Sequence, residues 1–237
     1  MDREDYPSFA VAAERGDQPG SSAGGEQPKF IAYAHNRHTI VKFTSEGDNP
    51  ISRRWRDLLL AEHHALEALR MAGISAANSA VFDQSGRRFL EIERFDRVGV
   101  RGRRAVHSLT ALDAEFVGNP RGAWPEIVEA LVRAGIVSEE ALEHAALLYA
   151  FGTSIGNTDM HNGNLSFVSE SGRPYQLAPA YGMLPMGFAP RSGGGLPETL
   201  APATLRPTVP TALWLKAIDM AGEFLQRLKS DERLSAG

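Results

Sequence analysis

The sequence predicts an α+β fold in which a small β-rich part is followed by a larger helical part. Two hairpin patterns flank one amphipathic helix early in the chain, and helical patterns dominate the remainder. The 237 residues, 43% of them hydrophobic, are enough to bury a substantial core. We divide the chain into a leader at 1–20, a β-rich lobe at 21–97 and a helical lobe at 98–237.

The β-rich lobe is expected to open with a hairpin. Residues 30–35 and 39–44 alternate apolar and polar side chains on either side of Asn36-Arg37, a short connection that suits a tight turn. Lys42 falls on the second of these strands. A strand lysine next to a turn is commonly solvated, so its position alone assigns no function.

A helix and a second hairpin complete the β-rich lobe. Residues 53–71 are predicted to form the helix, and Glu62 falls on its apolar face. That apolar face is formed by Trp55, Leu59, Leu66 and Leu69. Residues 80–82 and 89–93, joined through Gln84-Ser85-Gly86, predict the second hairpin.

The helical lobe includes three clear helical patterns and one short hairpin. Helical patterns cover 125–134, 139–151 and 211–229, the last with Trp214, Ile218, Phe224 and Leu225 as its apolar side chains. Between the second and third of these helices, residues 165–168 and 175–177 predict a hairpin.

Composition narrows the classes of function. The net charge of −4 gives no overall basic field for nucleic acid, so no direct nucleic-acid ligand is expected. The absence of cysteine excludes disulfides and cysteine metal sites. No signal-peptide pattern and no apolar run of membrane-spanning length occur, so no membrane association is expected and a cytoplasmic protein is predicted.

The sequence between Gly156 and Ser166 places Asp159 and Asn164 five residues apart on a loop. Phosphoryl transfer from ATP uses an Asp to accept the hydroxyl proton and a downstream Asn to hold the metal, so this spacing indicates kinase chemistry. Asp and Asn-Gly are also ordinary turn residues, so a plain polar turn remains an alternative.

Other signals occur in the order that a kinase requires. A Gly-rich segment at 21–29 would bring backbone amides close to phosphate oxygens, although a flexible linker has the same composition. Lys42 would reach the phosphates, and Glu62 would orient it. Residues 91–97 leave the second hairpin where a hinge would meet adenine. The succession of these features favours a protein-kinase-like two-lobed fold.

These motifs together resemble the HipA family, serine/threonine kinases that act as bacterial toxins in toxin–antitoxin pairs. The resemblance covers roughly residues 21–190. It is carried by Ser22-Ala23-Gly24-Gly25-Glu26-Gln27-Pro28-Lys29, Glu93-Arg94-Phe95-Asp96-Arg97, Asn157-Thr158-Asp159-Met160-His161-Asn162-Gly163-Asn164 and Leu177-Ala178-Pro179-Ala180-Tyr181.

The resemblance implies a role for each matching position. Asp159 would be the catalytic base, assisted by Lys42, and His161 would brace the loop rather than transfer protons. Asn164 would be a Mg²⁺ ligand, and Ser22 an autophosphorylation site. The residues expected to bind ATP are Ser22, Ala23, Gly24, Gly25, Gln27, Lys29, Lys42, Glu62, Glu93, Arg94 and Phe95.

The resemblance also implies cofactors and partners. Members use ATP with Mg²⁺, and those with known targets phosphorylate aminoacyl-tRNA synthetases, which leads to growth arrest or persistence. A cognate antitoxin, usually a DNA-binding protein, restrains them. We therefore expect a protein substrate and an antitoxin as partners.

The chain departs from the family pattern at two places. Gly182 stands where the family carries a metal-binding Asp after Pro-Ala-Tyr. A loss of roughly 4 kcal/mol of charge stabilisation would lower turnover about a thousandfold, so weak or no transfer is expected. Only about twenty residues precede the Gly-rich segment, so 1–20 is interpreted as a flexible leader or as the remnant of a longer region with a strand around Ser8 to Ala13.

Two other readings stay open. A pseudokinase would keep the kinase shape to bind a nucleotide or a partner, and Gly182 favours it. A small-molecule phosphotransferase of the aminoglycoside type uses a similar Asp-to-Asn loop. The second is weaker, because residues 22–29 and 93–97 look more like the toxin kinases.

Overall fold

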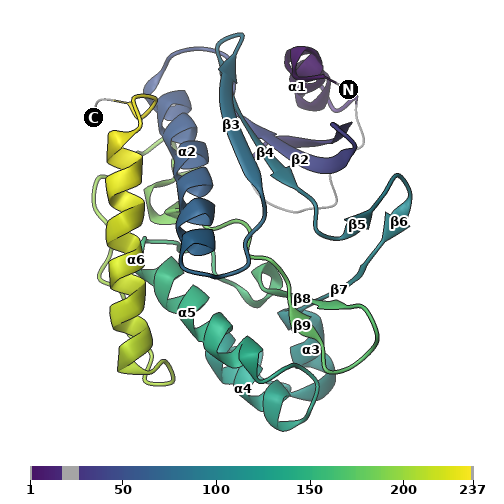
Figure 1. Cartoon of the computed structure of the whole chain (residues 1–237). Helices are drawn as coiled ribbons and strands as arrows, with labels where there is room; N and C mark the ends of the chain where they lie inside the picture. Colours follow the sequence, from purple (N-terminus) through teal and green to yellow (C-terminus); the bar gives the residue numbers. More distant parts are fainter. Residues whose placement is uncertain (1, 18–26, 236–237) are drawn as a thin grey trace.

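The structure is a computed structural model that describes residues 2–17 and 27–235. The N-terminal lobe holds a four-stranded antiparallel sheet with a helix on each face (Figure 1). Its elements are η1 (Arg3–Asp5), α1 (Tyr6–Glu14), β1 (Lys29–Ala34), β2 (Arg37–Phe43), α2 (Pro50–Met71), β3 (Ser79–Gln84) and β4 (Arg87–Glu93).

The sheet has the order β1-β2-β4-β3 and is built from the two expected hairpins. Each hairpin turns through two residues with positive φ, His35 and Asn36 in the first and Ser85 and Gly86 in the second. Such turns match the right-handed twist of the flanking strands, so they set the register. Both hairpins are thus confirmed, but the first turns at His35-Asn36 and not at Asn36-Arg37 as expected, because Arg37 begins β2.

One face of the sheet is covered by α1, where either a flexible leader or the strand of a longer region was expected. Tyr6 and Ala10, one helical turn apart, are fully buried against Phe30, Phe43 and Phe89 of the sheet. The expectation of a strand around Ser8 to Ala13 is therefore wrong. The burial of Tyr6 and Ala10, one helical turn apart, against the sheet favours a helix instead.

The opposite face of the sheet packs against α2. Leu59 of the helix is buried with Leu90 and Ile92 of β4. Asn49 caps the helix by accepting a hydrogen bond from the Ser52 amide, and Pro50 at the first turn suits the start of a helix. Because side chains alternate along a strand, Lys42 faces this side while Phe43 faces α1.

The C-terminal lobe is mainly helical. The expected helices and the expected hairpin are confirmed with small shifts of their ends. The elements are β5 (Arg97–Val98), β6 (Gly102–Arg103), β7 (Ala105–Ser108), α3 (Leu109–Phe116), α4 (Trp124–Arg133), α5 (Glu140–Ser154), η2 (Asn162–Asn164), β8 (Ser166–Ser169), β9 (Gln176–Leu177), η3 (Met186–Phe188) and α6 (Thr211–Ser230).

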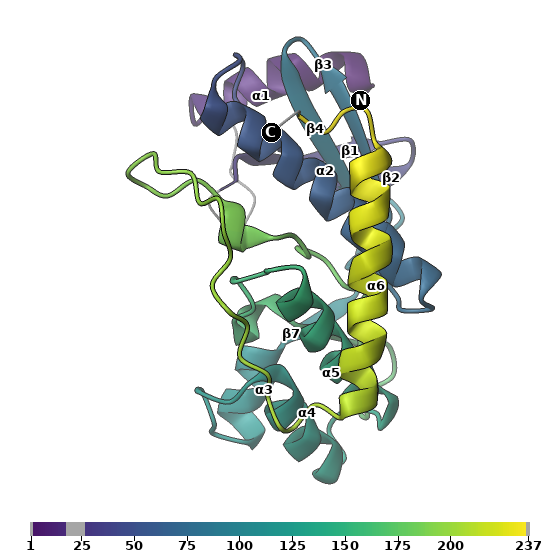
Figure 2. The ribbon, with the colours of Figure 1, turned by 90° about the vertical axis from the view of Figure 1, so that its left-hand side faces the viewer.

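Helix α6 joins the two lobes. It runs beside both α2 and α5 along the length of the molecule (Figure 2). Trp214 and Phe224 are buried as expected, whereas Ile218 and Leu225 are 56% and 48% exposed, so their assignment to the apolar face is wrong. The C-terminal half of α2 shares one core with the helices of the other lobe.

None of the helices in the described ranges 2–17 and 27–235 is long and apolar enough to cross a bilayer.

Candidate functional site

A pocket of about 460 Å³ lies between the sheet and the loop that follows α5. Its walls come from β1, β2, α2, the segment after β4, the loop at 159–164 and the segment at 181–186. The lining residues are Gln27, Lys29, Ile40, Lys42, Trp55, Leu59, Glu62, Ala77, Ile92, Glu93, Arg94, Phe95, Asp96, Val106, Asp159, Gly163, Asn164, Ser166, Tyr181, Gly182, Leu184 and Met186.

Lys42 and Glu62 form an ion pair at the inner wall of the pocket. The Lys42 Nζ donates to both carboxylate oxygens of Glu62, at 2.7 and 2.6 Å. The Glu62 side chain is fully buried, while 16% of the Lys42 side chain remains exposed. A buried carboxylate with this partner holds the ammonium group in one place, where it can meet an anion in the pocket.

A second ammonium group lies beside the first. Lys29 on β1 is the register partner of Lys42 on β2, and both side chains line the pocket. Burial, together with the positive charge of Lys42, lowers the pKa of Lys29. Two neighbouring cations in a partly buried cleft create a strong attraction for phosphate groups.

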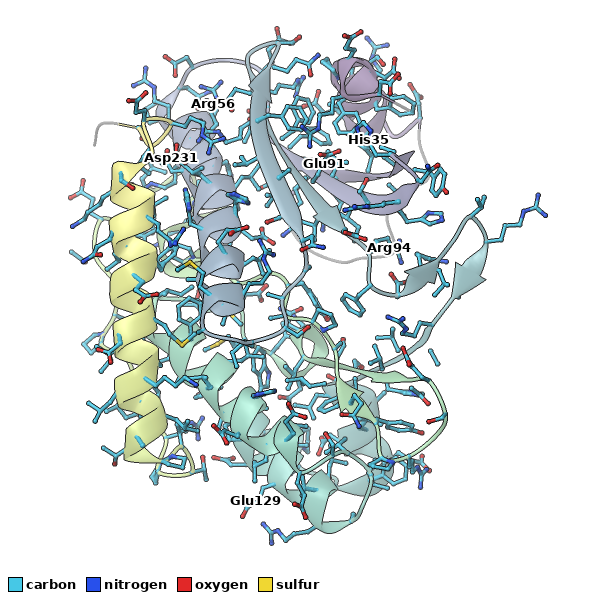
Figure 3. The ribbon with its side chains drawn as sticks, in the orientation of Figure 1. His35, Arg56, Glu91, Arg94, Glu129 and Asp231 are labelled. Carbon is cyan, nitrogen blue, oxygen red and sulfur yellow. The ribbon has the colours of Figure 1, made fainter. Side chains whose placement is uncertain are left out.

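The segment that leaves β4 forms the outer wall. Glu93, Arg94, Phe95 and Asp96 all line the pocket. Arg94 Nε and Nη2 donate to the two carboxylate oxygens of Asp96 at 2.8 and 2.6 Å, which fixes the path of the chain here (Figure 3 marks Arg94). This is where a hinge was expected.

The loop after α5 brings Asp159 and Asn164 together. The Asn164 Nδ2 donates to the Asp159 carbonyl at 2.7 Å and to the Asp159 Oδ2 at 3.2 Å. These contacts orient the carboxylate, and the Asp159 Oδ1 remains available on a side chain that is 54% exposed.

Asn157 anchors this loop, and the sequence alone gave it no role. Its Oδ1 accepts a hydrogen bond from the Asp159 amide at 3.0 Å, and its Nδ2 donates to the Gly182 carbonyl at 3.4 Å. The Asn157 side chain is buried and both contacts are partly buried. It therefore links the Asp159 loop to the segment around Gly182. Its place at the start of the Asp-to-Asn motif was the only signal for it.

His161 lies outside the lining of the pocket. Its Nδ1 accepts a hydrogen bond from the Gly163 amide at 3.0 Å, and its carbonyl accepts one from the Trp124 Nε1 at 3.2 Å. Its Nε2 is 3.9 Å from the Asp159 Oδ1. This arrangement supports a bracing role for His161.

Gly182 adopts a left-handed backbone conformation with φ of +63°. A Cβ atom placed there would meet no other atom within 4 Å. Space for a Cβ atom therefore exists at this position. Asp and Asn tolerate this conformation better than other non-glycine residues, so an Asp here would be accommodated at modest cost.

The structure thus brings most of the predicted site residues into one pocket. Those that line it are Gln27, Lys29, Lys42, Glu62, Glu93, Arg94, Phe95, Asp159, Asn164 and Gly182. Ser22, Ala23, Gly24 and Gly25 lie outside the described residues. Asp96, Ser166 and Tyr181 also line the pocket, although the sequence gave none of them an individual role and named Asp96 and Tyr181 only within motifs. The Ser166 and Tyr181 hydroxyl groups lie 2.7 Å apart.

The pocket fits a nucleotide. Ile40, Leu59 and Ile92 supply apolar surface for a base, while Lys29 and Lys42 supply charge for phosphates. The buried Oε1 of Gln27 has no hydrogen-bond partner in the described part of the chain, as expected of an acceptor that meets a ligand donor.

The fit to Mg²⁺ is incomplete. Asn164 and Asp159 offer oxygen atoms, but Gly182 offers no side chain. Within residues 2–17 and 27–235, no three His, Cys, Asp or Glu side chains gather as a metal site. A hard cation that prefers several oxygen ligands would rely largely on phosphate and water oxygens here.

Comparisons with known proteins agree with this geometry. The model of the family described as "HipA-like C-terminal domain" matches residues 21–224. The chain is similar to Toxin YjjJ of Escherichia coli (strain K12), with 43% identity over 236 residues. That alignment covers 97% of this chain but only 53% of the relative, so this chain spans about half of the relative's length.

Two solved structures share the fold. HipA in the Shewanella oneidensis MR-1 complex with HipB and operator DNA has a TM-score of 0.58 and 18% identity, covering 93% of this chain and 60% of that one. The Helicobacter pylori proinflammatory kinase CtkA has a TM-score of 0.53 and 16% identity, and the match covers 69% of this chain and 56% of that one. They confirm the protein-kinase-like α+β fold. The chain belongs to the HipA-like C-terminal domain family.

Proposed function

We propose that this chain binds ATP and is the kinase part of a toxin of a bacterial toxin–antitoxin system. The observation that carries the proposal is that the Lys42–Glu62 pair, Asp159 and Asn164 line one pocket. A buried cation for phosphates and a carboxylate for the acceptor hydroxyl are the two groups that phosphoryl transfer needs from the protein.

Each group has a defined task in this proposal. Lys42, held by Glu62, binds phosphate oxygens, with Lys29 beside it. Asp159 accepts the proton of a serine or threonine hydroxyl on its Oδ1, since Asn164 occupies the Oδ2. A Mg²⁺ ion bound with ATP would neutralise phosphate charge, with Asn164 as its protein ligand.

Gly182 limits the rate in this proposal, so the chain as it stands transfers phosphate weakly or not at all. A second candidate function follows from the same residue: a pseudokinase that binds a nucleotide or a partner without transferring phosphate. The pseudokinase is supported by the missing carboxylate at Gly182, and the kinase by the intact remainder of the site.

The partners in the proposal follow the family. The Shewanella oneidensis relative is found in a complex with HipB and operator DNA, which supports a cognate antitoxin, itself DNA-binding, for this chain. The proposed substrate is a protein, with an aminoacyl-tRNA synthetase as the family-type target and growth arrest or persistence as the result. Ser22 is the proposed autophosphorylation site, and the cytoplasm is the proposed location.

Nucleotide binding tests the proposal directly. Isothermal titration with ATP, with and without Mg²⁺, should show binding by the natural chain. The double variant Lys42→Met/Glu62→Gln should lose at least about tenfold in affinity, because the phosphates lose a charged partner. Lys216→Met removes an exposed lysine of α6 and should bind like the natural chain. Equal affinity in all three proteins would refute the assignment of the pocket.

A further inference from the structure

Residues 97–104 form a narrow two-stranded ribbon that stands away from the body of the molecule (Figure 1). We call this segment the basic ribbon. Gly102 is required in it, because a Cβ there would lie 2.3 Å from the carbonyl oxygen of Val98 on the opposite strand. Gly99 turns the chain with φ of +56°. The ribbon is therefore specified by the sequence.

The contacts of the basic ribbon fix its base and its tip. The Arg104 amide donates to the Asp96 carbonyl at 2.9 Å, and the Arg104 Nη1 donates to the Phe95 carbonyl at 3.0 Å. At the tip, the His38 Nε2 lies 3.0 Å from the carbonyl of Val100. The ribbon is held at both ends, so its outer side chains are presented in fixed places.

The charge of the basic ribbon is not balanced within the fold. Its eight residues include four arginines and no carboxylate, in a chain of net charge −4. Arg97 and Arg103 are direct cross-strand partners, and like charges in that relation destabilise a strand pair. Asp96 lies 3.4 Å from Arg97 and Glu170 lies 3.1 Å from Arg104, but Arg101 and Arg103 have no ion pair within the described ranges. Two arginines therefore lack a counter-charge.

Apolar side chains accompany these open arginines. Val98 and Val100 are 53% and 65% exposed, among the most exposed large apolar residues of the described chain. The ribbon is also next to the site, since Phe95 and Asp96 just before it and Val106 just after it line the pocket. A partner that covers the ribbon would lie at the mouth of the pocket.

We propose that the basic ribbon docks a protein segment in which acidic residues alternate with apolar residues. This inference rests on the proposed function, because the docked segment is the protein substrate whose hydroxyl group enters the pocket. Carboxylates would pair with Arg101 and Arg103, and apolar side chains would cover Val98 and Val100. Nucleic acid suits the surface less well, because its binding is dominated by the phosphate backbone, which offers no apolar side chains to cover Val98 and Val100.

Fluorescence anisotropy tests the docking with the full chain. The probe is a labelled twelve-residue peptide of alternating glutamate and leucine around one serine, compared with the same peptide carrying glutamine for glutamate. Arg101→Gln/Arg103→Gln should weaken binding of the acidic peptide about fivefold or more and reduce its salt dependence. Arg15→Gln/Arg133→Gln removes two exposed arginines elsewhere and should leave binding unchanged. Val98→Ser/Val100→Ser should also weaken it.

The outcomes separate this inference from the proposed function. Titration with ATP should give the natural affinity in every ribbon variant, since none of the changed residues lines the pocket. If the natural chain does not bind ATP but still binds the acidic peptide, the proposed function is wrong and the docking of the peptide is not. No binding of the acidic peptide, equal binding of the glutamine peptide, no effect of the arginine changes, or tighter arginine-dependent binding of a DNA duplex would each overturn the docking proposal.

Discussion

The Glu62 carboxylate, which has no exposed surface, accepts two hydrogen bonds from the Lys42 ammonium group across the gap between α2 and β2. The contact joins a helix to a sheet and places a positive charge at the wall of the pocket. Because Glu62 is so deeply buried, the two charges depend on each other for stability as well as for ligand binding.

Breaking this pair on one side should destabilise the fold. Lys42→Met leaves the Glu62 charge buried without a partner, and we expect a loss of about 3 kcal/mol or more in the free energy of unfolding. Adding Glu62→Gln removes that charge and should recover most of the loss. Urea unfolding measures both values. A single variant as stable as the natural chain would show that the pair does not stabilise the fold.

Asn157→Ala should impair phosphate transfer more than nucleotide binding. Its side chain positions the Asp159 amide and the Gly182 carbonyl but does not line the pocket. In a Gly182→Asp background, turnover should fall at least about tenfold while ATP affinity stays within about twofold. Ser154→Ala, which removes one hydrogen bond inside α5, serves as the control. A parallel loss of affinity would contradict a positioning role.

Tyr6→Phe should loosen α1 from the sheet. The Tyr6 hydroxyl donates to the buried Glu91 Oε1 at 2.5 Å, and Arg3 also donates to Glu91, which Figure 3 marks beside α1. We expect a loss of about 1–3 kcal/mol in the free energy of unfolding. Ser8→Ala, which removes an exposed hydrogen bond of the same helix, should cost about 0.5 kcal/mol or less. If Tyr6→Phe and Ser8→Ala lower the free energy of unfolding equally, in thermal or urea unfolding, the Tyr6–Glu91 hydrogen bond does not hold α1 on the sheet.

Stability should fall as pH drops below about 6.5, the ordinary pKa of histidine. Burial, followed by the charge of the adjacent His64, lowers the pKa of His63. The unfolded chain therefore binds a proton at a pH where folded His63 is still neutral, so the free energy of unfolding decreases from pH 6.5 down to the folded pKa. His63→Gln, which can still reach Ser79, should flatten this decrease. An unchanged slope between pH 5 and 6.5 would refute the role of His63.

The features that the sequence predicted well are local. Each hairpin depends on a two-residue turn, and the long helix depends on its repeating apolar face, so neighbouring residues were sufficient. The Asp159-to-Asn164 spacing indicated the site because both residues sit on one short loop. Lys42 and Glu62 were paired by the order of the motifs, and the structure confirms their contact.

The features that the sequence did not predict depend on distant contacts. The segment around Ser8 to Ala13 was expected as a strand if it was the remnant of a longer region, and the burial of Tyr6 and Ala10 against the sheet explains why it is a helix. The strand β7 forms by pairing with β8, which lies about sixty residues later in the chain, so the four residues of β7 alone did not predict a strand. The role of Asn157 depends on the position of Gly182, which a linear reading does not give.

The most direct test measures transfer of the radiolabelled γ-phosphate of ATP, with Mg²⁺, to the chain itself and to a bacterial lysate. The natural chain, Gly182→Asp and Gly182→Asp/Asp159→Asn are compared. We expect strong labelling of protein only by Gly182→Asp, about a thousandfold above the natural chain, because position 182 has open space for a Cβ atom and the Asp would restore the missing ligand. Equal transfer by the natural chain and Gly182→Asp, or transfer that survives Asp159→Asn, would contradict it.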